Sequence, residues 1–345
     1  MDALQKEISL QGHFIPSSEK IDSIYFGGGT PSLLKESELA LIMEALHRKF
    51  TVTADAEITL EANPDDVTKR MVKEWMHLGI NRLSLGIQSF NEAELQWMNR
   101  AHTADESLKS IDEIQDAGMD NFSVDLIFGS PVQTNAILEE NAAIIINRNI
   151  PHISCYALTV EPRTALHKMV EVNRSLPVDA DNQATQFLLL LDLLQQNGYE
   201  QYEISNYAKP GMRSKHNSSY WEGKAYYGFG PSAHSFDGVN RRRWNVSNNA
   251  LYIQQLSHGQ IPYEEEVLTQ AQQLNEYIMT ALRTTEGINT VYVAETFGVG
   301  KLEKLMAAGK TFIESGRIMI TGNNSMALTR EGKLFADGIA AALFF

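Results

Sequence analysis

The chain has 345 residues, 43% hydrophobic and 21% charged, which is the composition of a globular protein with room for a large α/β domain and a smaller appendage. Its formal net charge of −14 excludes a broad nucleic-acid surface, because such a surface needs clustered Lys and Arg. No apolar run approaches the roughly 18 residues of a membrane span, and the acid-containing start is neither a signal nor a transit peptide, so we expect a cytoplasmic location.

Strand-like segments recur along the first two thirds of the chain, spaced by roughly thirty residues, the size of a βα unit. They are Ile21–Phe26, Glu57–Leu60, Arg82–Ile87, Phe122–Phe128 and His152–Leu158. Stretches with helical spacing lie between them, and glycines at 79, 118 and 198 mark the ends of three helices. We expect helix starts at Asp65-Asp66, after a proline, and at Asn91, three residues before Glu94.

Alternating strands and helices at this period predict a parallel sheet, either doubly wound or curled into a barrel. Polar residues or glycines stand at the C-terminal ends of successive apolar strands, at Gly27–Thr30, Glu61, Gln88, Asp125 and Tyr156-Ala157. Such a series describes the active face of a β/α barrel, whereas a doubly wound nucleotide fold concentrates its chemistry at one switch point. We therefore predict a full or partial β/α barrel.

The pattern changes after Asn206, and the sequence predicts three parts. These are a barrel over residues 1–206, an irregular connecting region over 207–264 and a compact α-rich domain over 265–345. The last part has a helix, two shorter helices, a hairpin and a final helix, an order that resembles a winged helix. From Leu268 onward it carries seven basic and seven acidic residues, which argues against DNA binding and favours packing or partner docking.

Four motifs occur in order along the barrel: Tyr25–Ser32 (YFGGGTPS), Glu61–Pro64 (EANP), Gly86–Phe90 (GIQSF) and Asp125–Gly129 (DLIFG). A glycine run alone would be weak evidence for any family. The ordered set of four motifs resembles radical S-adenosylmethionine (SAM) proteins of the oxygen-independent coproporphyrinogen III oxidase and heme chaperone group. The resemblance covers nearly the whole chain. It implies a partial (β/α)6 barrel with a small winged-helix-like C-terminal domain.

The resemblance also implies a SAM site. Glycines let the backbone approach a ligand, and in the family this loop faces the methionine moiety of SAM. An arginine fork suits the SAM carboxylate. The residues that the family pattern assigns to SAM are Gly27, Gly28, Gly29, Thr30, Glu61, Gln88, Arg100 and Asp125. The alternatives are a βα turn without a ligand, a structural polar network at the barrel mouth and a solvated arginine.

The chain departs from the family at the iron–sulfur cluster. The family holds a [4Fe–4S] cluster with three cysteines of a CxxxCxxC loop after the first barrel strand. Here Cys155 is the single cysteine, lies in an apolar strand and is expected to be a buried structural thiol. The chain as given is therefore not expected to hold the cluster or to reduce SAM by itself. We favour a truncated or misassigned start over a paralogue that has lost the chemistry.

Without the first strand, the edge of the next one would be open to pairing. We therefore expect a homodimer, or disorder near Gln11–Glu19.

A further motif concerns heme. His216–Trp221 (HNSSYW) resembles the HNxxYW motif of the heme chaperone branch. The resemblance implies His216 as a possible heme-iron ligand, with Asn217, Tyr220 and Trp221 as heme contacts. Candidate cations for the propionates are Lys215 and Arg241–Arg243, and His234 is a second possible ligand. The alternative is that His216 only satisfies a loop and the two aromatics are core residues.

Three functions compete. The first is heme binding and transfer to an acceptor protein, with SAM and a cluster in the full-length protein. The second is oxygen-independent coproporphyrinogen III oxidation, in which a SAM-derived radical begins the decarboxylation of propionates to give protoporphyrinogen IX. The third is a metal-independent β/α-barrel lyase or isomerase, which the SAM-like positions and the lack of a strand-end lysine disfavour. We favour the first.

Overall fold

The computed structural model describes residues 1–12, 14–15, 19–172 and 175–345 of the chain. The chain forms two compact units, and strands β1 (Ile21–Phe26) and β2 (Val52–Ala62) pass from one to the other. The first unit comprises residues 1–24, 34–57 and 215–345, and the second comprises 25–33 and 58–214. Of the stretch 11–19, where disorder was expected, residues 13 and 16–18 lie outside the described residues.

A seven-stranded sheet runs in the order β1-β2-β3-β4-β5-β7-β6. After β1 and β2, its strands are β3 (Arg82–Gln88), β4 (Phe122–Phe128), β5 (His152–Ala157), β6 (Glu200–Gln201) and β7 (Asn206–Ala208). Strands β2 to β5 are parallel, and the two short strands β7 and β6 return antiparallel. The predicted α/β fold with a mainly parallel sheet is confirmed.

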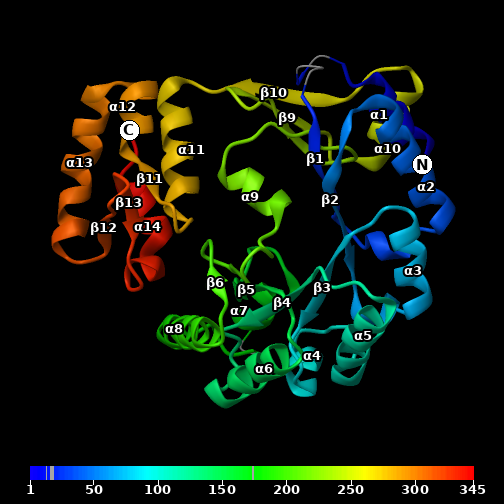
Figure 1. Ribbon diagram of the computed structural model, residues 1–345, viewed down its shortest axis with the longest axis horizontal. Helices are drawn as coiled ribbons and strands as arrows, with labels where there is room; N and C mark the ends of the chain where they lie inside the picture. The colour runs from blue at the N-terminus through cyan, green and yellow to red at the C-terminus, as the bar shows by residue number, and fades with distance from the viewer. Residues whose placement is uncertain (13, 16–18, 173–174) are drawn as a thin grey trace. The chain divides into compact units, whose positions relative to one another are not determined.

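Helices connect the strands of the second unit. They are α3 (Lys69–His77), α4 (Glu92–Trp97), α5 (Ala104–Ala117), α6 (Asn135–Asn147), α7 (Ala165–Glu171) and α8 (Ala180–Gln196), with 3₁₀ turns η1 (Pro31–Leu33) and η2 (Pro64–Asp66). Figure 1 shows α4, α5, α6 and α8 gathered on one side of β3, β4 and β5. These helices cover one face of the sheet, as β/α crossovers do.

The two faces of the sheet differ in chemistry because side chains alternate along each strand. On β3, Leu83, Leu85 and Ile87 are all 0% exposed. The opposite face carries small polar groups, and the register aligns Ser84 with Ser123 and Asp125 with Ser154. Parallel strands that are buried on both faces have continuous apolar sequences. The alternation seen here therefore indicates that the face with the small polar groups is suited to a polar ligand.

The helix ends follow the glycine signals, and one predicted helix start is wrong. Gly79, Gly118 and Gly198 have φ values of 95°, 87° and 81°, the left-handed conformation of a helix C-terminus. Helix α3 begins at Lys69 instead of Asp65-Asp66, because the segment after Pro64 forms the 3₁₀ turn η2. The hydroxyl of Thr68 caps α3 by accepting the backbone N–H of Met71.

The first unit contains α1 (Asp2–Leu10), α2 (Glu36–Lys49), α9 (Lys215–Trp221), α10 (Asn249–Ser257) and a sheet of β8 (His234–Phe236), β9 (Arg241–Asn245) and β10 (Tyr263–Val267). Glu7 of α1 is 0% exposed and accepts hydrogen bonds from the Tyr252 hydroxyl, the Gly230 N–H and the Asn245 amide at 2.6, 2.8 and 2.6 Å. Burial raises the pKa of Glu7. Its hydrogen bonds hold α1 to segments more than two hundred residues away.

The C-terminal part of this unit has the order of a winged helix, helix–strand–helix–helix–strand–strand. Its elements are α11 (Gln270–Leu282), β11 (Ile288–Asn289), α12 (Thr290–Phe297), α13 (Val299–Glu314), β12 (Ile318–Ile320), β13 (Ser325–Leu328), η3 (Gly332–Phe335) and α14 (Ala336–Ala342). The three strands pair antiparallel in the order β11-β13-β12. Among the described residues, no helix is long and apolar enough to cross a bilayer.

Candidate functional site

The glycine loop after β1 is shaped by Glu61 at the end of β2. The Glu61 carboxylate accepts the Tyr25 hydroxyl on Oε1 at 2.7 Å and the Gly28 N–H on Oε2 at 3.1 Å. Gly28 and Gly29 have φ values of +79° and +67°, a conformation that other residues rarely adopt. A Cβ on Gly27 would lie 2.6 Å from the Tyr25 ring, so the loop needs glycine there.

Of the other predicted SAM residues, Gln88 ends β3, Arg100 follows α4 and Asp125 lies within β4. Arg100, in the turn after α4, donates from Nη2 to the Asn63 side chain and to the Gly86 carbonyl, both at 3.2 Å. A Cβ on Gly86 would lie 3.1 Å from Gln88 Nε2 and 3.4 Å from Arg100 Nη2. Gln88 has a φ of 68°, a left-handed conformation for a residue other than glycine. Glu61 thus lines one glycine position, at Gly27, and Gln88 and Arg100 line a second one, at Gly86.

Asp125 on β4 is the most perturbed acid of this edge. Burial raises the pKa of Asp125 to about 7, and the nearby Glu61 carboxylate adds to the rise. Asp125 Oδ1 is buried and accepts no hydrogen bond from any described residue, and Arg100 Nε is likewise buried without an acceptor among them. Buried polar atoms are normally satisfied, so an unused acceptor and an unused donor fit a polar ligand such as SAM.

The chain does not fit a [4Fe–4S] cluster by itself. Cys155 on β5 is 4% exposed, which confirms the predicted buried thiol, and burial raises its pKa well above the ordinary value. Such a thiol stays protonated, whereas a cluster ligand must be a thiolate. Within the described ranges, no group of three or more His, Cys, Asp or Glu residues is placed to hold a metal ion.

The HNxxYW segment forms helix α9, and no residue of α9 is buried. The predicted alternative that its aromatics are core residues is therefore wrong. The His216 Nδ1 lies 2.8 Å from the Ser23 hydroxyl of β1, and its ring meets the Tyr220 ring edge-on at 5.1 Å. The guanidinium of Arg283 lies 5.7 Å from the centre of the Trp221 ring. Asn217, the next residue after His216, is half-buried.

His234, the second candidate ligand, is exposed on β8, and its ring lies 6.3 Å from the Trp244 ring.

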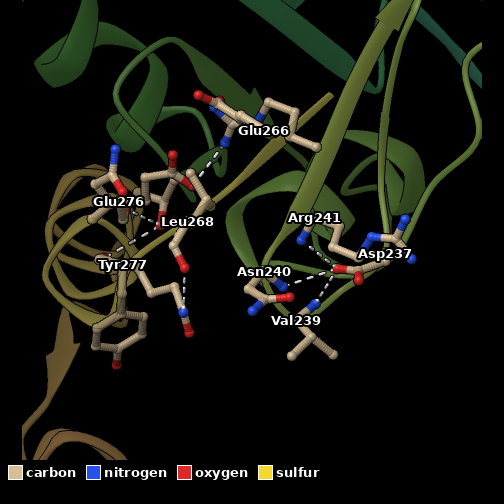
Figure 2. Close-up of polar contacts among 12 residues, drawn as sticks. Asp237, Val239, Asn240, Arg241, Glu266, Leu268, Glu276 and Tyr277 are labelled. Atoms are coloured by element: carbon tan, nitrogen blue, oxygen red, sulfur yellow. Dashed lines mark hydrogen bonds and ion pairs between the residues drawn. The ribbon is translucent and has the colours of Figure 1, made fainter. Parts of the chain in front are cut away.

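The predicted propionate cations are paired within the chain. Arg241 and Arg243 of β9 both bind Glu265 of β10, and Arg242 binds Glu266 at 3.6 Å and Glu276 of α11 at 2.7 Å. Figure 2 shows this region, in which Asp237 accepts the backbone N–H groups of the turn that leads into β9. Lys215 pairs with Asp55 of β2 at 3.1 Å. Their charges are therefore already balanced by acids of the same unit.

The comparisons with known proteins agree with this geometry. Residues 14–145 match the radical SAM superfamily, whose members use SAM and a [4Fe–4S] cluster, and the fold and its polar strand ends define a radical SAM protein. "Heme chaperone HemW" of Bacillus subtilis is 33% identical, over 93% of this chain and 85% of the relative. The Haemophilus influenzae protein of the same name is 31% identical, over 92% and 82%. The chain belongs to the HemW family of radical SAM proteins.

A solved structure supports the fold. Coproporphyrinogen III oxidase (HemN) from Escherichia coli superposes with a TM-score of 0.82, covering 99% of this chain and 82% of that one. Its sequence identity is 20%, so the likeness is one of fold. The identity of the relatives therefore favours the heme chaperone expectation over the oxidase.

Sequence reasoning missed three residues of these sites, namely Tyr25, Ser23 and Glu57. Tyr25 was noticed only as part of a glycine motif, although its hydroxyl holds Glu61. Ser23 and Glu57 lie 193 and 159 residues before His216, and each hydrogen-bonds to it. No local signal in the sequence connects them.

Proposed function

We propose that this chain binds heme through His216 and passes it to an acceptor protein. The observation that carries the proposal is helix α9, which presents a histidine and two aromatic side chains without burying any of them. An imidazole can ligate heme iron, and aromatic rings can pack against a porphyrin. The HemW relatives, which are named heme chaperones, support this function.

The proposal includes SAM at the carboxyl edge of the parallel strands. Gly27–Thr30 and Glu61 would receive the methionine part, Arg100 the carboxylate, and Gln88 and Asp125 the remaining polar groups. The unused Asp125 and Arg100 atoms and the two glycine positions support this assignment. When bound, SAM with a reduced cluster supplies radical chemistry, but no step through the cluster follows from a chain with a single, buried cysteine.

Replacing His216 with alanine is expected to weaken hemin binding by about tenfold or more, because the iron loses its protein ligand. A hemin titration followed at the Soret band, for His216→Ala and the unaltered chain, measures this. His258→Ala is the matched control, since His258 is exposed at the end of α10 and bonds only to its own helix and Ser257 in the described structure. An unchanged Soret position and affinity in His216→Ala would contradict the proposal.

A homodimer belongs to the proposal as well. Strand β1 stands at one end of the strand order, and no strand in the described part of the chain pairs with its outer edge. An open edge is a template for pairing with a second copy. Size-exclusion chromatography with light scattering is expected to give twice the 38.6 kDa chain mass, and a clean monomer at all concentrations would exclude the dimer.

A further inference from the structure

The helix that carries His216 is held by a buried carboxylate of β2. Glu57 is 6% exposed, and its two oxygens accept the backbone N–H groups of Lys215 and His216, each at 2.9 Å. These are N–H groups of the first turn, which have no acceptor within the helix. Hydrogen bonds to a charged acceptor are among the stronger ones, so the backbone of His216 is fixed where α9 begins.

A second contact fixes the ring itself. The Ser23 hydroxyl of β1 lies 2.8 Å from His216 Nδ1, and the imidazole ring makes a T-shaped contact with the ring of its neighbour Tyr220, at an interplanar angle of 87°. Ser23 and Glu57 lie on strands that are neighbours in the sheet. His216 is thus held at its backbone, at one ring nitrogen and by the neighbouring Tyr220 ring.

The contact at Nδ1 has a consequence for the ring proton. A serine hydroxyl can donate or accept, so it tolerates either tautomer of a neutral imidazole. When Nε2 binds a metal ion its lone pair is used, and the ring proton must then stand on Nδ1. Ser23 is placed to accept that proton, which is how second partners of ligating histidines set ring orientation and ligand strength.

We propose that Ser23 is a positioning residue for heme, which orients His216 and accepts its Nδ1–H so that Nε2 ligates the iron. The inference rests on the proposed function, since it assigns a partner to the same ligand. It assigns no contact between Ser23 and the porphyrin. Glu57 serves the same end by holding the backbone, and the exposed ion pair of Lys215 with Asp55 adds little.

The test is a hemin titration of Ser23→Ala and Ser23→Thr beside the unaltered chain. Ser23→Ala is expected to weaken hemin binding by about tenfold, as loss of such partners does for metal sites, and to broaden the Soret band. Ser23→Thr keeps the hydroxyl and is expected to restore both. Ser257→Ala is the matched control, because that hydroxyl lies at the exposed end of α10. Equal affinity in Ser23→Ala and the unaltered chain would overturn the proposal.

A double variant separates the two ideas. If Ser23 acts through His216, then Ser23→Ala has no further effect in the His216→Ala background. An equal loss in both backgrounds would mean that Ser23 only supports the fold, and it would overturn the inference. If His216→Ala binds hemin as the unaltered chain does, the proposed function itself fails.

The potential of the bound iron gives a readout that folding does not move. Ser23→Asp would place a carboxylate at Nδ1, which makes the imidazole a stronger donor and is expected to lower the midpoint potential of the heme. The potential of Ser23→Asp is measured by spectroelectrochemical titration. A potential equal to that of the unaltered chain would count against the contact.

Discussion

Replacing Glu94 with alanine is expected to lower the free energy of unfolding by about 4 kcal/mol, among the largest effects of a single substitution in a core. Glu94 of α4 is 0% exposed. Its carboxylate accepts hydrogen bonds from four side chains of the β3 and β4 loops and of α6. These are Ser89, Ser130, Gln133 and Asn141. Alanine would leave these donors buried without their acceptor, which costs more than the hydrogen bonds contribute.

The effect is measured by urea unfolding of Glu94→Ala. Glu140→Ala is the matched control, because Glu140 is exposed on α6 beside Asn141 and should change stability by no more than about 0.5 kcal/mol. Glu94→Ala should also weaken SAM binding, since its partner Ser89 directly follows the left-handed Gln88. If Glu94→Ala and Glu140→Ala unfold at the same urea concentration, the carboxylate does not hold these loops together.

Replacing Asp125 with asparagine is expected to stabilise the protein at pH 8 much more than at pH 4. The folded chain raises the pKa of Asp125 from 3.8 to about 7, mainly through burial. A raised acid pKa means that the folded state favours the neutral form. The stability that the folded protein has with a neutral Asp125 is fully present below pH 3.8 and is lost as the pH rises through 7. The stability advantage of Asp125→Asn should therefore grow over this range by up to ~4 kcal/mol.

Chemical unfolding at several pH values between 4 and 8 tests this expectation, with the unaltered chain measured in parallel. Asp120→Asn is the control, because Asp120 is exposed just before the same strand. The difference between Asp125→Asn and the unaltered chain is compared at each pH, so that the titration of all other groups cancels. A difference that stays constant with pH would show that Asp125 ionises in the folded protein as it does in the unfolded one.

The sheet could be predicted from the sequence because its strands carry local signals. Strands β1 and β4 have the predicted bounds, and β3 and β5 differ by one residue. Strand β2 begins five residues earlier than predicted, at Val52, because that part contains exposed polar residues and lacks an apolar pattern. The helix start predicted at Asp65-Asp66 is wrong because the segment that begins at Pro64 forms a 3₁₀ turn, and the α-helix begins only after it.

The candidate SAM site could be predicted from the sequence because of the topology of the sheet. The ends of parallel strands meet at one edge, so polar residues at strand ends must gather there, whatever their separation in sequence. No such topological rule predicts which residues surround His216. Its partners Ser23 and Glu57 come from strands far back in the chain, and their pairing depends on tertiary packing. The arginines of β9 face acids of the next strand, which the sequence alone did not align.

The hydrogen bonds of Glu7 bear on how the polypeptide matures as it leaves the ribosome. The partners of Glu7 lie 223, 238 and 245 residues further along. At synthesis rates of about 5–20 residues per second, roughly 10–50 seconds pass before Tyr252 is made. Over that time the second unit, which ends at residue 214, has all its residues and can fold. Until then Glu7 lacks its three hydrogen-bond partners, so the buried contacts of α1 are completed only when the later segment is made.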